Sequence, residues 1–184
     1  MRIAAFSLAA VCAVIGLAAP APAPAQPLPA PASYPPVVAA KGLITTHELS
    51  LDMAEKIARA GIDQCRKMGF HTTMVVVDSS GTMKAFLRDD QTGPHTINLA
   101  QDKAYTALTL ANRFATSLNF SKARGGTLGT AMPNVRGLTT VGGGVPIKYH
   151  GEVIGAVASS GAVGADKDEI CSQAGIDAVA ADLK

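Results

Sequence analysis

Aromatic and charged residues are scarce in this chain of 184 residues. Aromatic side chains make up 4%, tryptophan is absent, and charged residues account for 16% with a formal net charge of +2. Nucleic-acid binding requires clustered cations for phosphates and aromatic rings for unstacked bases, so this composition argues against a nucleic-acid partner. Alanine, valine and glycine must instead form a core of small side chains with close backbone contacts.

The first residues differ in composition from the rest of the chain. An apolar run from Ile3 to Leu17 follows a single arginine and leads to Ala23-Pro24-Ala25, which is the layout of a secretory signal peptide over residues 1–25. A membrane anchor is the alternative reading, but the run is shorter than the ~20 residues of a spanning helix, and prolines follow it. We therefore expect export to the periplasm or the extracellular space, with no membrane insertion after signal cleavage.

Eight of the eleven prolines lie between Pro20 and Pro36, and most of the chain's glycines lie between Gly125 and Gly164. The Pro/Ala-rich residues 26–42 cannot build a core and are predicted to form a disordered tether. Residues 43–184 then have the usual size of one domain.

Apolar periodicity predicts three helices. Apolar residues recur at three- and four-residue steps between residues 51 and 69, with Ser50 as N-cap, although a capping box of Thr45 and Glu48 would start this helix earlier. A second helix is predicted over residues 96–112, and a last one begins at Asp166. In that last helix, Asp168 and Glu169 are interpreted as dipole-stabilising residues rather than an acid/base pair.

Short β-branched runs predict two hairpins. Residues 73–78 and 82–88 are separated by a turn sequence ending in Gly81, and residues 145–149 and 152–159 flank His150-Gly151. The glycine-rich residues 122–137 lack periodicity and are predicted to be a loop. Hairpins imply an antiparallel sheet, so helices packed on it give the α+β class rather than a doubly wound nucleotide fold.

Several short motifs from Leu49 to the C-terminus, in their order and spacing, resemble the GlcG/HbpS-like family of small heme-binding proteins. These motifs are Val76-Val77-Asp78-x-x-Gly81, Leu87-Arg88-x-Asp90, Gly93-Pro94, Ala100-x-x-Lys103-Ala104-x-Thr106-Ala107, Thr116-Ser117-Leu118, Gly143-Gly144-x-Pro146-Ile147, Gly151-x-x-Ile154-Gly155, Ser160-Gly161 and Asp168-Glu169. The resemblance implies a profilin-like domain with about five antiparallel strands, and assembly into homo-oligomers.

The same resemblance implies heme as the cofactor. Secreted members of the family are similar to accessory proteins of heme sensing or uptake, so we expect an exported protein that captures or presents heme without turnover. A membrane sensor or transporter is a possible partner. Two departures bear on the pocket: Gln91 stands where the family usually has glycine, and the later Gly-x-Ser-Gly motif is Ala158-Ser159-Ser160-Gly161 here, which exchanges a glycine for a side chain.

Heme requires an apolar slot, an axial ligand to iron and cations for its propionates. His95 follows Gly93-Pro94 at the N-terminus of the second predicted helix. It is either an iron ligand or an exposed helix-start residue. His150 lies in a hairpin turn and is expected to be solvated, His71 is expected to be structural, and His47 fits either role.

The resemblance adds two threonines, because a threonine hydroxyl has been taken as the iron contact in heme-binding relatives. Thr106 and Thr116 match these positions and are alternative ligands to His95. A hydroxyl binds iron weakly, which suits transient capture. The alternative for Thr106 is a hydrogen bond to a carbonyl one turn earlier in its helix.

Arg88 and Lys103 are candidate partners for the propionates, since a guanidinium pairs with a carboxylate through two hydrogen bonds. Alternatively, Arg88 forms a turn network with Asp90, and Lys103 pairs with Asp102 or Asp89. Tyr105 is either a flank of the porphyrin or a subunit contact.

Familiar enzyme motifs are absent. The sequence contains no G-x-S-x-G, no H-E-x-x-H, and no phosphate-loop lysine after its Gly142–Gly144 triplet. An enzyme that acts on a small oxygenated metabolite or degrades heme, with Arg88 anchoring a carboxylate, is the alternative function.

Cys65 and Cys171 are the two cysteines outside the leader. In an oxidising compartment such a pair is a disulfide candidate, which would join the first and last helices on one face of the sheet. Two free buried thiols are the alternative.

Overall fold

The computed structural model describes residues 42, 44–126 and 135–184. The predicted signal peptide, all of the predicted tether except residue 42, and residues 127–134 of the predicted loop lie outside the described residues. The elements in chain order are α1 (Leu51–Lys67), β1 (Thr73–Asp78), β2 (Met83–Arg88), α2 (His95–Leu110), α3 (Ser117–Ala123), β3 (Gly144–Tyr149), β4 (Glu152–Ser160) and α4 (Ala165–Asp177).

The strands form one antiparallel sheet in the order β2-β1-β4-β3. Both predicted hairpins are present, and the central pair joins β1 to β4, with Thr73 opposite Ser160 and Asp78 opposite Gly155. The α+β class is confirmed. The described residues contain four strands, one fewer than the sheet of about five that the resemblance implies.

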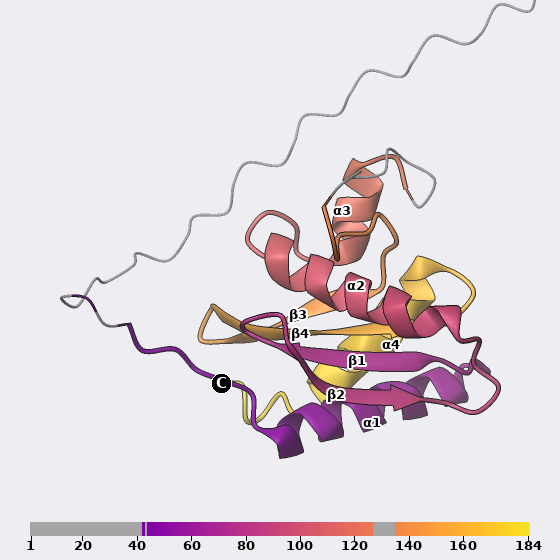
Figure 1. Ribbon diagram of the computed structural model, residues 1–184. Helices are drawn as coiled ribbons and strands as arrows, with labels where there is room; N and C mark the ends of the chain where they lie inside the picture. Colours follow the sequence, from indigo (N-terminus) through magenta and orange to yellow (C-terminus); the bar gives the residue numbers. More distant parts are fainter. Residues whose placement is uncertain (1–41, 43, 127–134) are drawn as a thin grey trace, which may run out of the picture.

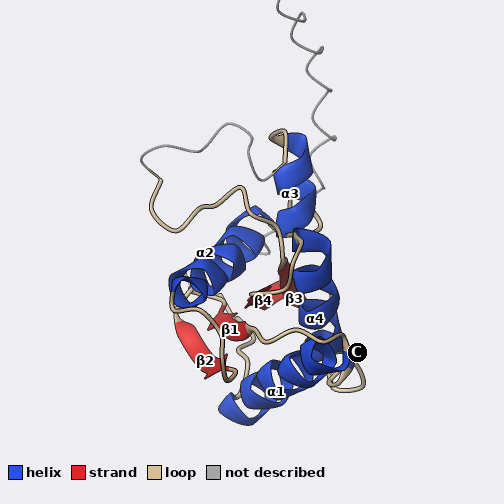
Figure 2. Cartoon of the chain, turned by 90° about the vertical axis from the view of Figure 1, so that its right-hand side faces the viewer, coloured by secondary structure: helices blue, strands red, loops and turns tan. Residues whose placement is uncertain are grey.

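The helices cover both faces of the sheet. α2 packs on one face against β1, β3 and β4, whereas α1 and α4 pack side by side on the other face (Figures 1 and 2). The alternation of β1 explains this arrangement, because Val75 and Val77 point into the α2 layer and Met74 and Val76 into the α1/α4 layer.

The α2 layer is built from small side chains, as the composition predicts. Ala100, Ala104 and Ala107 of α2 pack directly on the sheet. A Cβ on Gly144 would lie 2.3 Å from the carbonyl oxygen of Lys103 and 3.0 Å from Cβ of Ala107. Glycine at this position therefore allows α2 to lie against the backbone of β3.

Local capping determines two helix starts. Ser50 is the N-cap of α1 and accepts a hydrogen bond from the backbone of Met53, so the capping box at Thr45 is not used. Thr116 caps α3 in the same way through the backbone of Asn119. The helix α3, which has only seven residues, is not among the helices predicted from the sequence.

Candidate heme site

A cleft of about 280 Å³ opens between the start of α2 and the turn that joins β4 to α4. Its α2 wall consists of His95, Leu99 and Lys103, which are spaced four residues apart and so share one stripe of the helix. The opposite wall is backbone-rich, running from Ser160 to Ala165, and Val141 closes one end.

His95 is the histidine that lines this cleft, and its ring has no polar partner among the described residues. Two others are hydrogen-bonded, since His47 Nδ1 lies 2.6 Å from Glu152 and His71 Nδ1 lies 2.9 Å from Asp89. The exposed ring of His150 meets the ring of Tyr149 edge-on, away from the residues that line the cleft. The His95 ring is exposed and lies over Gly93, where a Cβ would approach it to 2.8 Å. His95 is therefore available to bind a ligand in the cleft.

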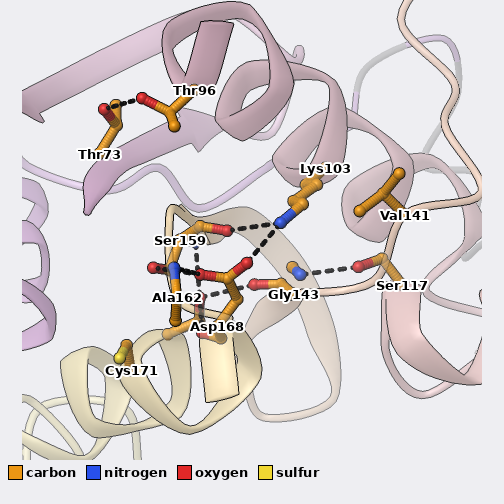
Figure 3. A network of polar contacts seen from close by, with 12 residues as sticks. Thr73, Thr96, Lys103, Ser117, Val141, Gly143, Ser159, Ala162, Asp168 and Cys171 are labelled. Atoms are coloured by element: carbon orange, nitrogen blue, oxygen red, sulfur yellow. Dashed lines mark hydrogen bonds and ion pairs between the residues drawn. The ribbon is translucent and has the colours of Figure 1, made fainter. Parts of the chain in front are cut away.

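Lys103 and Asp168 form an ion pair at the floor of this cleft (Figure 3). Lys103 Nζ lies 2.6 Å from Oδ2 of Asp168 and donates a second hydrogen bond of 3.1 Å to the carbonyl of Ser159. The carboxylate of Asp168 also accepts hydrogen bonds from the Ser159 hydroxyl and the Ala162 backbone. Lys103 is only 1% exposed and Asp168 3%.

The ion pair connects helices on opposite faces of the sheet, α2 and α4. It does so beside Gly143, just before β3 begins, where a Cβ would lie 2.7 Å from Cβ of Asp168 and 3.2 Å from Lys103 Nζ. Gly143 has a φ of +128°, a backbone conformation that glycine adopts readily. The absence of a side chain there allows the two charged groups to meet.

Burial acts on both groups of the pair. It lowers the pKa of Lys103 and raises the pKa of Asp168, while the opposite charge of each partner counteracts the shift. The hydrogen bonds from Ser159 and Ala162 also favour the charged carboxylate. A buried charge pair with this many partners can position a neighbouring backbone turn or exchange a proton within the cleft.

A disulfide links Cys65 of α1 to Cys171 of α4, which confirms the predicted bridge. Cys171 lies one helical turn after Asp168, and Sγ of Cys65 lies 3.6 Å from the hydroxyl of Ser159. The bridge therefore fixes the helix that carries the acidic half of the ion pair.

The other predicted site residues lie away from His95 or are already hydrogen-bonded. Arg88 donates to the carbonyl of Thr92 through both Nε and Nη2, so it forms a turn network, though with Thr92 rather than Asp90. The hydroxyl of Thr106 accepts from the backbone of Thr139 at 2.9 Å and donates to Gly137, not to its own helix.

Neither of the two carboxylates predicted to pair with Lys103 does so. Asp89 is bound by Arg66 and His71, and Asp102 makes no ion pair within the described part of the chain. Burial alone raises the pKa of Asp102. The pairing of Lys103 with Asp102 or Asp89 is therefore wrong, because Asp168 takes that place.

Tyr105 lies on another stripe of α2 and lines a second groove of about 770 Å³. Its ring packs between the backbones of Gly81 and Gly137, where a Cβ on either glycine would lie 2.9 Å from a ring carbon. Asn98, Gln101 and Arg136 also line this polar groove. Tyr105 and His95 thus face different grooves.

In the ranges 44–126 and 135–184, no group of three histidine, cysteine or acidic side chains is arranged to hold a metal ion. No helix of the described chain is long and apolar enough to cross a membrane.

Comparison with known proteins identifies the family. The sequence model of the family described as "Haem degrading protein HbpS-like" matches residues 49–177. The chain belongs to the HbpS-like family. Protein GlcG of Escherichia coli K12, a relative, is 33% identical over 112 residues, which cover 61% of this chain and 81% of GlcG.

Solved structures agree with this HbpS-like assignment. A double mutant of HbpS from Streptomyces reticuli is 30% identical, with a TM-score of 0.66, over 80% of this chain and 97% of that chain. A PduOC–heme complex is 24% identical, with a TM-score of 0.61, over 72% of this chain and 95% of that chain, and it shows the shared fold.

Asp168 is not among the site residues predicted from the sequence. The dipole interpretation is consistent with its place in the first turn of α4, but it overlooked that Asp168, Cys171, Ser172 and Gly175 form the buried stripe of that helix. Lys103 likewise stands in the buried alanine stripe of α2. One charged residue in each of two buried stripes is the signal that could have revealed the pair.

Proposed function

We propose that this protein binds heme in the cleft beside α2, with His95 as the axial ligand to iron. The observation that carries the proposal is the unpaired, exposed imidazole of His95 on the wall of that cleft, in a chain of the HbpS-like family. The fold shared with a PduOC–heme complex supports it. Imidazole is a usual protein ligand of heme iron.

The residues of the cleft fit one edge of a porphyrin. Leu99 and Val141 supply apolar walls, and the turn from Ser160 to Ala165 lets a flat ligand approach the backbone. The volume of about 280 Å³ lies just below the range for small-molecule pockets, which begins at about 300 Å³. Much of the porphyrin would therefore lie outside a single chain, which suits capture and transfer.

The alternative ligands fit less well. The hydroxyl of Thr106 already holds the backbone of Thr139, and that of Thr116 already caps α3. Lys103 is neutralised by Asp168, so it does not offer a free charge to a propionate. Arg88 is exposed and would have to exchange the Thr92 carbonyl for a propionate.

When bound, heme supplies an iron coordination site and a flat apolar surface. Separate residues of the chain would then have separate roles. His95 would hold the iron, Leu99 and Val141 would exclude water from one side, and the Lys103–Asp168 pair would fix the backbone turn on the other side. None of these roles requires turnover of heme.

We also propose export to the periplasm or the extracellular space. Support comes from the signal-peptide pattern and from the Cys65–Cys171 bridge, since disulfides persist mainly in oxidising compartments. A membrane sensor or transporter is the proposed recipient of the heme. Cell fractionation followed by intact-mass measurement tests export: the mature chain should begin at Gln26 and carry the bridge, and a full-length cytosolic chain would refute it.

Heme degradation is the second candidate function. The description of the matching family and the buried Lys103–Asp168 pair, whose groups can exchange a proton at the cleft floor, favour it. A protein that only binds would keep its Soret absorbance when incubated with ascorbate and oxygen, apart from the loss that a matched hemin solution shows. Loss of the Soret band with formation of an open-chain tetrapyrrole would establish turnover.

Hemin titration of purified residues 42–184 tests binding itself. We expect a saturable Soret difference band with a dissociation constant in the micromolar range or tighter. A difference spectrum that stays flat across that range would refute heme binding.

A further inference from the structure

β2 is an edge strand whose outer side has no strand partner within the described part of the chain. The sheet order places β2 at one end and β3 at the other. Figure 2 shows β2 at the margin of the domain between α2 and α1; α1 packs against one face of β2, and the outer edge of the strand faces away from the rest of the sheet. An uncovered edge strand presents free backbone N–H and C=O groups that can pair with another strand.

The two edges of the sheet are protected to different extents. β3 contains Pro146, which lacks an N–H, and its first four residues are buried. β2 contains no proline. Its one lysine, Lys84, folds back onto its own chain, where Nζ donates a 2.8 Å hydrogen bond to the carbonyl of Leu49. Lys84 therefore does not place a charge at the edge of β2 that would oppose pairing with another strand.

Apolar side chains remain exposed along this edge. Phe86 is 38% exposed and Met83 36%. A groove of about 590 Å³ runs between β2 and α1, with Ala85, Phe86 and Leu87 on its β2 side. Exposed aromatic surface next to an open edge is a common feature of interfaces.

On the α1 side of the groove, four charged side chains form a row in which the two acidic residues precede the two basic ones. Asp52 and Glu55 come first, Lys56 and Arg59 follow, and all four side chains are exposed and line the groove. None of them forms an ion pair in the residues that the structure describes. Because α1 and β2 run in the same direction along the groove, the negative end of the row lies beside the start of β2 (Figure 1).

We propose that the β2 edge is an isologous interface, where a second copy of this chain pairs its own β2 antiparallel to the first. A two-fold axis near Phe86 would bring the Phe86 rings of the copies together. It would also run the two α1 rows antiparallel, setting Asp52 of each copy opposite Arg59 of the other, and Glu55 opposite Lys56. Such a row is complementary to itself only in the antiparallel arrangement.

Charge reversals provide the specific test, with the dissociation constant measured by sedimentation equilibrium. Asp52→Arg and Arg59→Asp would each set like charges opposite one another and weaken self-association by about tenfold. The double variant Asp52→Arg/Arg59→Asp restores opposite charges and should recover it. An equimolar mixture of the two single variants should also associate, as a heterodimer.

A hydrophobic substitution tests the same edge independently. Phe86→Arg should weaken association by more than tenfold, whereas Ile170→Arg, at a 50% exposed position on α4, should leave it unchanged. Circular dichroism should show every variant folded. A wild type that stays monomeric at high concentration would overturn the proposal. Association that survives Phe86→Arg, or charge variants that fail to complement each other, would overturn it as well.

Discussion

Lys103 and Asp168 lie 65 residues apart in the chain, and their side chains meet at 2.6 Å although their helices pack on opposite faces of the sheet. The pair is buried beside the cleft that contains His95. It links the α2 layer to the α4 layer where no strand separates them, and the side-chain-free Gly143 makes room for it. The geometry of the cleft thus depends on this contact.

Breaking one half of this pair should destabilise the fold. Asp168→Asn leaves a buried ammonium without its counter-charge, which we expect to reduce the free energy of unfolding by about 3–5 kcal/mol. Lys103→Met/Asp168→Asn removes both charges and should be more stable than Asp168→Asn alone. Urea denaturation of the two single variants and the double variant measures the coupling. A double variant whose loss equals the sum of the single losses would show that the pair makes no specific contribution.

The Asp89 cluster should make stability depend on pH. Hydrogen bonds from the Arg66 guanidinium hold the pKa of Asp89 well below its usual range; His71 adds to this effect, and burial opposes it. Because the folded pKa lies below the unfolded value of about 3.9, the stabilisation is present at neutral pH and is lost as the pH falls below about 5.

Asp89→Asn is the variant that measures this effect. We expect it to cost about 2–3 kcal/mol at pH 7, and the difference from wild type should shrink as the pH falls toward 2. Asp182→Asn, at an exposed carboxylate near the C-terminus, is the matched control and should be neutral at every pH. A difference for Asp89→Asn that does not change between pH 7 and pH 3 would rule out ionisation of Asp89 as its cause.

The disulfide should contribute strongly to stability. It joins residues separated by 106 positions, and a loop of that length corresponds to about 4–5 kcal/mol in the chain-entropy model. Cys65→Ala/Cys171→Ala should therefore unfold at a much lower urea concentration than the oxidised wild type. Wild type unfolded and refolded under reducing conditions should behave like the double variant. Equal urea midpoints for the oxidised and bridge-free proteins would contradict this contribution.

Local sequence determined most of the fold. The span of β1 was predicted without error, and the starts of α1, α2 and α4 within one residue, because capping, turn residues and apolar periodicity all act over a few neighbours. The helix α3 was missed because seven residues capped by Thr116, about two turns, are too few for periodicity to show.

The site was harder to predict than the fold. The position of His95 after Gly93-Pro94 makes it a candidate iron ligand, which stays a prediction, and the structure adds that His95 lines a cleft where α2 meets the β4–α4 turn. The partner of Lys103 could not be found by searching nearby residues, since the contact depends on how two helices are placed across the sheet. The alternative of a hydrogen bond from Thr106 to its own helix is wrong for a similar reason, because the partners of its hydroxyl, Gly137 and Thr139, come from a distant loop.

Heme binding through His95 is tested most directly by parallel hemin titrations of wild type, His95→Ala and His150→Ala, followed through the Soret band. The account predicts saturable binding by wild type and by His150→Ala with the same spectrum. His95→Ala should show a shifted Soret band and an affinity at least about tenfold lower, as loss of a metal ligand requires. A His95→Ala variant with the affinity and spectrum of wild type would contradict the assignment of the iron ligand.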